Sequence, residues 1–288
     1  MTSSSVTITG IFCYPVKSCK PVTLKKAVLT PQGIPYDRQW MIVNEKNAFV
    51  TQRQNSKLTL IATALTEQGL QLSLPDVPPI TIPYAMPQGE RISTEVFGAA
   101  CETIDEGELV SQWLTQHLHS ERPLRLVRMA DDFSRQQDEP ALQSDNNQHH
   151  VHFADAAPYL VVNEASLSEL NKQLIMAGEQ PVPMNRFRPS IVVSGLPAFA
   201  EHAIHSLSNS HCELAAKLAC ERCIIPTIDQ QTGQRDAAMQ PFKMLQDING
   251  TADEKRSPKF GEYMALILGE GSVLAVGDEL SVGSANKG

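Results

Sequence analysis

Short runs of alternating apolar and polar residues, broken repeatedly by proline and glycine, dominate the first hundred residues of the chain. Residues 70–74 are the clearest case, because Leu70, Leu72 and Leu74 alternate with polar residues at the period of a half-buried strand. Many short strands with almost no helical periodicity predict a barrel or a strongly curved sheet. We expect strands at residues 6–8, 22–24, 40–43, 58–61, 70–74 and 92–96.

A change of period near residue 109 predicts a helix between two β-rich regions. Apolar residues from Leu109 to Leu118 fall on one helical face, and Asp105 is the predicted N-cap. A second helix is expected after Asn163, ending at Gly178. The polar stretch 131–150 is predicted to be a mobile loop. Further strands are expected at residues 125–129, 158–162, 191–193, 214–218, 224–228, 263–268 and 273–276.

The charge and hydropathy of the chain exclude some classes of partner. A formal net charge of -8 argues against general nucleic-acid binding, which needs an excess of Lys and Arg, but it leaves room for a small anion in a local basic pocket. The longest apolar run, residues 264–268, is far shorter than the ~20 residues that span a bilayer, and the N-terminus lacks the pattern of a signal peptide. We therefore expect a cytoplasmic protein without a membrane partner.

Two cysteines at Cys-x-x-Cys spacing, Cys220 and Cys223, stand out among the six in the chain. Arg222 directly precedes the second, and a neighbouring guanidinium favours the thiolate form that ligates metals. The spacing alone leaves three interpretations open: half of a zinc site, a thioredoxin-like redox pair, or two ordinary buried thiols.

Cationic residues recur at the ends of predicted strands. Lys17 and Ser18 follow the first strand, Arg38 precedes the strand at 40–43, and Arg188 precedes the strand at 191–193. Arginine suits phosphate because its planar fork donates hydrogen bonds in pairs. Any one of these residues could be a solvated loop cation, but their recurrence favours a shared anion site.

Several motifs in order along the chain resemble those of the MOSC family, named after the C-terminal domain of molybdenum cofactor sulfurases. The N-terminal motifs are Tyr14-Pro-Val-Lys-Ser18, Asp37-Arg38-x-Trp40 and Thr51-Gln52-Arg53. The C-terminal motifs are Phe187-Arg-Pro-x-Ile-Val-Val-Ser-Gly195, Cys220-x-Arg-Cys223 and Phe260-Gly-x-Tyr263. The chain is most similar to the mitochondrial amidoxime-reducing components and their bacterial relatives, without the C-terminal ferredoxin domain that some of these carry.

The resemblance implies a mainly β (α+β) fold in two parts. Residues 5–122 would form the MOSC N-terminal β-barrel domain, and residues 123–284 the MOSC β-barrel domain with a few helices. The molybdenum cofactor, a molybdopterin that carries the metal, would lie between the two domains.

The resemblance also assigns roles to individual residues. Cys223 would coordinate molybdenum and Asp155 would border the metal as a catalytic residue, whereas Cys220 is expected only to pack. Ser190 stands where relatives often carry Asn, and Glu221 replaces a small residue. The cofactor-binding side chains would be those of Lys17, Ser18, Arg38, Arg188, Ser190 and Arg222.

The function implied is that of a molybdenum-cofactor-dependent oxidoreductase that reduces N-hydroxylated small molecules, such as amidoximes and hydroxylamines. No cysteine follows Cys223, so electrons would come from a separate reductase or ferredoxin. Two other interpretations stay open: a carrier of sulfur or cofactor with a persulfide on Cys223, and a binding module with a degenerate site.

Overall fold

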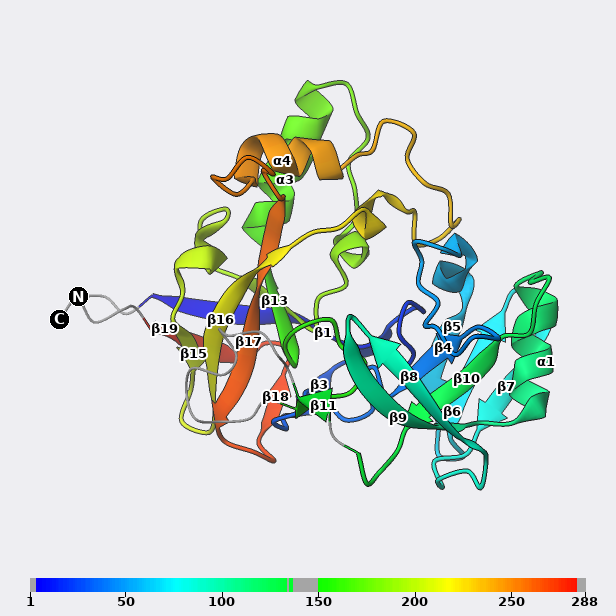
Figure 1. Ribbon diagram of the computed structural model, residues 1–288. Coiled ribbons are helices and arrows are strands. Elements are labelled where there is room, and N and C mark those ends of the chain that lie inside the picture. Colours follow the sequence, from blue (N-terminus) through cyan, green and yellow to red (C-terminus); the bar gives the residue numbers. More distant parts are fainter. Residues whose placement is uncertain (1–3, 134, 137–149, 284–288) are drawn as a thin grey trace.

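The computed structural model describes residues 4–133, 135–136 and 150–283, which form two β-rich lobes lying side by side (Figure 1). One lobe is a barrel, on the left of the view. The other contains two smaller sheets and helix α1 (Glu108–His117) at its outer edge. Helices α3 (Glu164–Met176) and α4 (Phe242–Asn249) lie together above the barrel. The prediction of a mainly β fold with few helices is confirmed.

The barrel is closed by seven strands in the order β14-β13-β17-β16-β15-β19-β1, with β1 pairing back onto β14. Closure leaves no unpaired sheet edge. Apolar side chains from every part of the ring fill its interior, among them Val6, Val161, Val193, Leu214 and Met264. The strands are β1 (Ser5–Cys13), β13 (Tyr159–Asn163), β14 (Ile191–Ser194), β15 (Ser206–Ser208), β16 (Glu213–Glu221), β17 (Lys259–Leu268) and β19 (Glu279–Gly283).

One pair in the barrel, β13 and β14, is parallel, and a parallel pair needs a crossover connection. Helix α3 supplies it. The helix begins after Asn163, whose side chain accepts a hydrogen bond from the backbone N–H of Ala165, and the chain turns at Gly178 with a φ of 79°. Both ends of this helix match the sequence prediction.

The second lobe is built on a four-stranded and a three-stranded sheet around a shared core. Trp40, Leu58, Leu70 and Leu114 all lie in that core, and Leu114 comes from α1. The four-stranded sheet contains β4 (Trp40–Val43), β10 (Arg125–Met129), β9 (Ala99–Asp105) and β8 (Arg91–Val96). The three-stranded sheet contains β5 (Ala62–Leu65), β6 (Leu70–Leu74) and β7 (Val77–Ile82). Short strands β2 (Val22–Leu24), β3 (Lys26–Val28) and β18 (Val273–Ala275) add to the barrel side.

The lobes exchange strands across the boundary predicted near residue 122. Strand β1 completes a barrel otherwise built from residues 159–283, and β10 completes the sheet of the other lobe. The domain bounds 5–122 and 123–284 stay a prediction from the sequence. Residues 14–18, which follow β1, pass directly from the barrel towards the other lobe, as the backbone bridge between Val16 and Trp40 shows.

Three local predictions were wrong. Residues 56–60 form a 3-10 helix rather than a strand, because the Asn55 side chain caps the turn by accepting from the N–H of Lys57. Residues 225–227 form another, which contains Pro226, a residue without an N–H for a strand ladder. The N-cap of α1 is Gly107 and not Asp105, because Asp105 is still paired with Val127 as the last residue of β9.

Part of the polar stretch at 131–150 is described. Strands β11 (Arg135–Gln136) and β12 (His150–Val151) pair with each other, and residues 137–149 lie outside the described residues, so the prediction of a mobile loop is untested there. No helix in the described part of the chain is long and apolar enough to cross a membrane.

Candidate functional site

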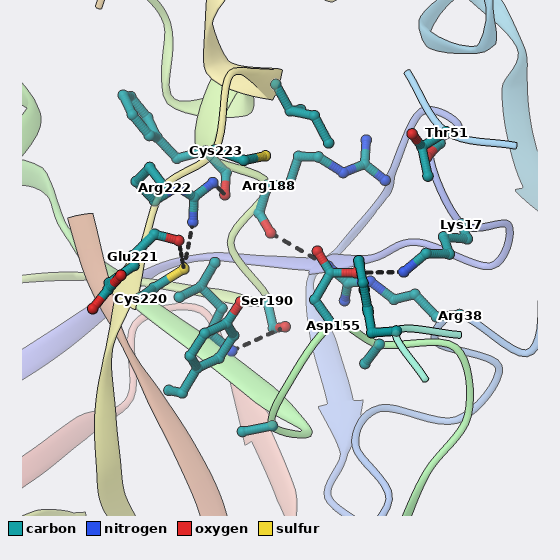
Figure 2. Close-up of a pocket in the computed structure, with 18 of the residues that line it drawn as sticks. Lys17, Arg38, Thr51, Asp155, Arg188, Ser190, Cys220, Glu221, Arg222 and Cys223 are labelled. Atoms are coloured by element: carbon teal, nitrogen blue, oxygen red, sulfur yellow. Dashed lines mark hydrogen bonds and ion pairs between the residues drawn. The ribbon is translucent and has the colours of Figure 1, made fainter. Parts of the chain in front are cut away.

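A cavity of about 270 Å³ lies where the two lobes meet (Figure 2). Its wall contains all eight residues that the sequence assigned to a site, although they come from segments as far apart as residues 17 and 223. These are Lys17, Ser18, Arg38, Asp155, Arg188, Ser190, Arg222 and Cys223. The structure therefore brings the predicted set together, while the role of each residue in binding a ligand stays a prediction.

Cys223 is the one exposed thiol among the six cysteines; the other five are buried. It stands just after β16, in the loop that leads to the 3-10 helix at 225–227. Cys220 lies within β16, and burial raises the pKa of its thiol even though Arg222 opposes the shift. Of the pair at Cys-x-x-Cys spacing, only Cys223 is exposed at the cavity. No three His, Cys, Asp or Glu residues gather as a metal cluster in the described part of the chain.

Arg222 is held by the barrel. Its guanidinium donates to Sγ of Cys220 at 2.8 Å and to the carbonyl of Phe187 at 2.7 Å, and its backbone N–H donates to the carbonyl of Pro258 at 2.7 Å. Figure 2 shows the side chain turned towards Cys220, whereas the Cys223 thiol points to the other side of the loop. Arg222 thus fixes the loop that presents Cys223.

Tyr14, which the sequence analysis quoted but gave no role, organises two of the cavity's cations. Its ring lies 4.3 Å from the guanidinium carbon of Arg38 and 4.4 Å from that of Arg188. Cation–π contacts of this kind orient a guanidinium without neutralising it. Burial raises the pKa of Tyr14 to about 12, so the ring stays uncharged at neutral pH. Its place in the segment Tyr14-Pro-Val-Lys-Ser18 was the only sequence signal.

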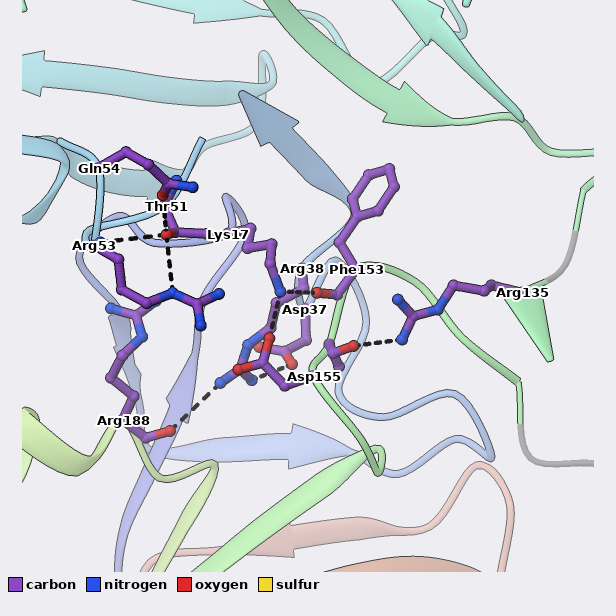
Figure 3. A network of polar contacts seen from close by, with 11 residues as sticks. Lys17, Asp37, Arg38, Thr51, Arg53, Gln54, Arg135, Phe153, Asp155 and Arg188 are labelled. Atoms are coloured by element: carbon purple, nitrogen blue, oxygen red, sulfur yellow. Dashed lines mark hydrogen bonds and ion pairs between the residues drawn. The ribbon is translucent and has the colours of Figure 1, made fainter. Parts of the chain in front are cut away.

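Arg38 and Arg188 are further fixed by their backbones. Both adopt a left-handed conformation, with φ of 47° and 54°, which is uncommon for residues that carry a side chain. Arg38 also contacts the carboxylate of Asp37 and donates to the carbonyl of Arg188 at 3.4 Å, while Arg188 donates to the carbonyl of Cys19 at 2.8 Å. These contacts hold both guanidinium groups at the cavity wall (Figure 3).

Lys17 and Asp155 form an ion pair across the lobes, and the Lys17 ammonium also donates to the carbonyl of Phe153 at 2.8 Å. Burial lowers the pKa of Lys17, and Asp155 opposes that shift. Burial alone would raise the pKa of Asp155, but Lys17, Arg38 and Arg188 hold it down at about 2. Because 55% of the Asp155 side chain is exposed, water screens these charges and the strength of the pair is smaller than the shift suggests.

Ser190 and Ser18 are each held by one hydrogen bond, Ser190 through its side chain and Ser18 through its backbone carbonyl. Oγ of Ser190 accepts a hydrogen bond of 3.3 Å from the N–H of Leu160, which leaves its own proton available. The carbonyl of Ser18 accepts a hydrogen bond of 2.7 Å from the amide of Gln52. Both residues line the cavity.

The charge of the cavity is opposite to that of the chain. Five cationic side chains line it, against the carboxylates of Asp155 and Glu221 among the lining residues described. In a protein of net charge -8 such a concentration favours an anionic ligand. Thr51, Arg53 and Phe97 also line the cavity, and the sequence analysis assigned them no role.

Comparison with known proteins agrees with the geometry. Residues 5–121 match the family described as "MOSC N-terminal beta barrel domain", and residues 148–281 match "MOSC domain". "Mitochondrial amidoxime-reducing component 1" of Xenopus laevis is 30% identical over 94% of this chain and 80% of its own length. The human protein of the same name is 32% identical over 90% of this chain and 78% of its own length. "Mitochondrial amidoxime reducing component 2" of Bos taurus is 30% identical over 90% and 79%.

Proposed function

Because the chain belongs to the family that joins a MOSC N-terminal beta barrel domain to a MOSC domain, we propose that its cavity binds a molybdenum cofactor and reduces N-hydroxylated small molecules. One observation carries the proposal most strongly: the only exposed thiol of the chain lies in a cavity lined by five cationic side chains. A thiolate suits a soft metal, and cations suit the phosphate of a pterin cofactor.

The residues present fit such a group. Cys223 would be the single protein ligand to the metal, because Cys220 is buried and receives a hydrogen bond from Arg222. Lys17, Arg38 and Arg188 would hold the phosphate and pterin, with Ser18 and the Ser190 hydroxyl as hydrogen-bonding groups. The cofactor, when bound, supplies the redox chemistry.

The protein's own contribution is to position the residues that would bind the cofactor. Arg222 fixes the loop that carries the metal ligand, and Tyr14 fixes two of the cations that would grip the cofactor. Asp155 keeps the Lys17 ammonium at the cavity wall, and as a group with a pKa of about 2 it would act as a carboxylate and not as an acid. Its expected catalytic role is therefore electrostatic.

The substrate class comes from the printed names of the relatives, which are amidoxime-reducing components. Reduction of an amidoxime to an amidine cleaves the N–O bond, consumes an electron pair and two protons, and releases water. We also propose that a separate reductase or ferredoxin supplies the electrons. We also propose that the protein is located in the cytoplasm.

Turnover tests the proposal. The protein, produced in a host that makes the cofactor, would be supplied with electrons from a reduced viologen dye and offered benzamidoxime and N-hydroxyguanidine. We expect amidine and guanidine to form, and activity to be lost in Cys223→Ala but kept in Cys212→Ala, where the cysteine is buried away from the cavity. Labile sulfur on Cys223 without turnover would instead favour the sulfur-carrier function.

A further inference from the structure

Arg53 differs from the other cations of the cavity in lacking a strong partner. Arg38 and Lys17 contact carboxylates, and Arg222 donates to a carbonyl and a sulfur. The half-buried Arg53 side chain makes one weak hydrogen bond, from Nε to the Thr51 hydroxyl at 3.4 Å. Among the residues described, no carboxylate lies within ion-pair distance of it, and its two terminal nitrogens have no hydrogen-bond partner.

Hydrogen bonds hold the backbone turn that carries Arg53. Its N–H donates to the Thr51 hydroxyl at 3.2 Å, and the N–H of Thr51 donates to the Gln54 side chain at 2.9 Å. The amides of Gln52 and Gln230 pair with each other at 3.1 Å and tie this turn to the barrel lobe. A half-buried cation held in place without a counter-charge carries an uncompensated desolvation cost, which an anionic ligand would offset.

Phe97 provides a second, independent observation at the same place. Val96 pairs with Ala99, so Phe97 and Gly98 are the two turn residues of the β8–β9 hairpin. Their φ values of 51° and 87° are those of a type I′ turn, which favours Asn, Asp or Gly at both positions. A phenylalanine there is strained, and its side chain remains 52% exposed, so neither turn geometry nor core packing explains it.

The Phe97 ring faces the cations. Its centroid lies 5.1 Å from the ammonium of Lys17 and 5.7 Å from the guanidinium carbon of Arg53, and Phe49 meets it edge-on at 5.3 Å. The ring and the Arg53 guanidinium therefore form one corner of the cavity, and both residues come from the N-terminal part of the chain, whereas Cys223 comes from the C-terminal part.

We propose that Arg53 and Phe97 form an oxyanion subsite at the cavity. The terminal N–H groups of Arg53 would grip a phosphate or a carboxylate in a bidentate manner, and the Phe97 ring would cover the planar group attached to it. The oxyanion belongs either to the cofactor or to the substrate. The subsite goes beyond the proposed function, since its capacity to bind an anion does not depend on redox activity.

Calorimetric titration of the full chain, produced without cofactor, tests the subsite directly with pyrophosphate and with benzoate as probes. We expect Arg53→Gln to weaken binding of one or both probes by about tenfold to a hundredfold. This is the loss of affinity expected when one charge-assisted hydrogen-bonded pair is removed. Lys57→Gln is the matched control, because it removes the same charge from an exposed position four residues away that does not line the cavity.

The two probes, together with the pterin content, show whether the bound anion belongs to the cofactor or to the substrate. Loss of pyrophosphate binding, together with a lower pterin content of Arg53→Gln from a cofactor-producing host, assigns the subsite to the cofactor phosphate. Loss of benzoate binding with unchanged pterin content assigns it to a substrate carboxylate. Equal affinities of Arg53→Gln and Lys57→Gln for both probes, or no binding of either probe to the unchanged protein, would overturn the proposal.

Phe97→Asn separates a binding role from a structural one. Asparagine suits the turn, so the midpoint of thermal unfolding should stay the same or rise while affinity for the bound probe falls. A fall in thermal stability with unchanged affinity would show that the ring serves the fold and would remove Phe97 from the subsite.

Discussion

Arg222 donates a hydrogen bond of 2.8 Å to Sγ of Cys220, the cysteine three residues before the exposed Cys223. With its second bond to the carbonyl of Phe187, the guanidinium spans two points that an ammonium cannot reach together. The sequence had suggested that Arg222 favours a thiolate at Cys223. In the structure its contacts are with the other cysteine and with the loop backbone.

Replacing Arg222 with Lys should therefore lower the free energy of unfolding. Each buried hydrogen bond to a charged donor contributes about 1.5–3 kcal/mol, and the lysine can keep only one of the two, so we expect a loss of about 2 kcal/mol. Urea denaturation measures it. Arg256→Lys, at a largely exposed arginine, should change stability by less than about 0.5 kcal/mol, and an equally stable Arg222→Lys would contradict the assigned role.

We predict that Tyr14 positions Arg38 and Arg188 through its aromatic ring and not through its hydroxyl group. Tyr14→Phe keeps both cation–π contacts, whereas Tyr14→Leu removes the surface on which Arg38 and Arg188 lie. We expect Tyr14→Leu to lose about 1–3 kcal/mol of stability and Tyr14→Phe much less. Pyrophosphate affinity, measured by calorimetry, should fall only in the leucine variant. Equal loss in both would mean that the hydroxyl group is what matters.

The acid behaviour of Asp155 gives a pH prediction. Its pKa in the folded protein is about 2, below the ~3.9 of an unfolded chain, so its contribution to stability is complete above pH ~4 and disappears as the pH falls towards 2. Carbon-13 NMR of the carboxyl group should show no titration between about pH 4 and pH 9. In Lys17→Met the pKa should move upwards; titration near pH 6 in the unchanged protein would contradict the assignment.

Arg128 and Glu106 form a buried ion pair in the second lobe, which contains the two smaller sheets. Nε of Arg128 donates to Glu106 at 2.6 Å, and its terminal nitrogens donate to the carbonyls of Pro83 and Tyr84 at 2.7 Å. Arg128→Met leaves a carboxylate buried without its partner, so we expect a loss of about 3–5 kcal/mol by urea denaturation. Arg122→Met breaks an exposed pair and should cost less than about 1 kcal/mol. A similar effect of both changes would refute this account.

The sequence was most informative where a local pattern decides the structure. Leu70, Leu72 and Leu74 alternate and form a strand, and Asn163 caps a helix as expected. The segment around Leu58 has the composition of a strand, but the Asn55 side chain caps it as a 3-10 helix. Composition alone does not show whether a capping hydrogen bond or strand pairing is the more favourable.

Some residues of the candidate site could be predicted from the sequence and others could not. Cys223, Lys17 and Arg38 could be found because motif and charge mark them, and the structure brings them into one cavity. Tyr14, Arg53 and Phe97 could not, because their significance lies in contacts between segments that are distant in sequence. Local periodicity also does not predict that β1 and β10 pair with strands of the other lobe, because strand pairing depends on the tertiary fold.

The most direct test of the account is the molybdenum content of the protein purified from a host that makes the cofactor. Elemental analysis should find close to one metal per chain, with bound pterin, in the unchanged protein and in Cys212→Ala, and little metal in Cys223→Ala. Absence of molybdenum from the unchanged protein, in a host shown to load another molybdenum enzyme, would contradict the central claim. Full metal retention in Cys223→Ala would show that this thiol is not the ligand.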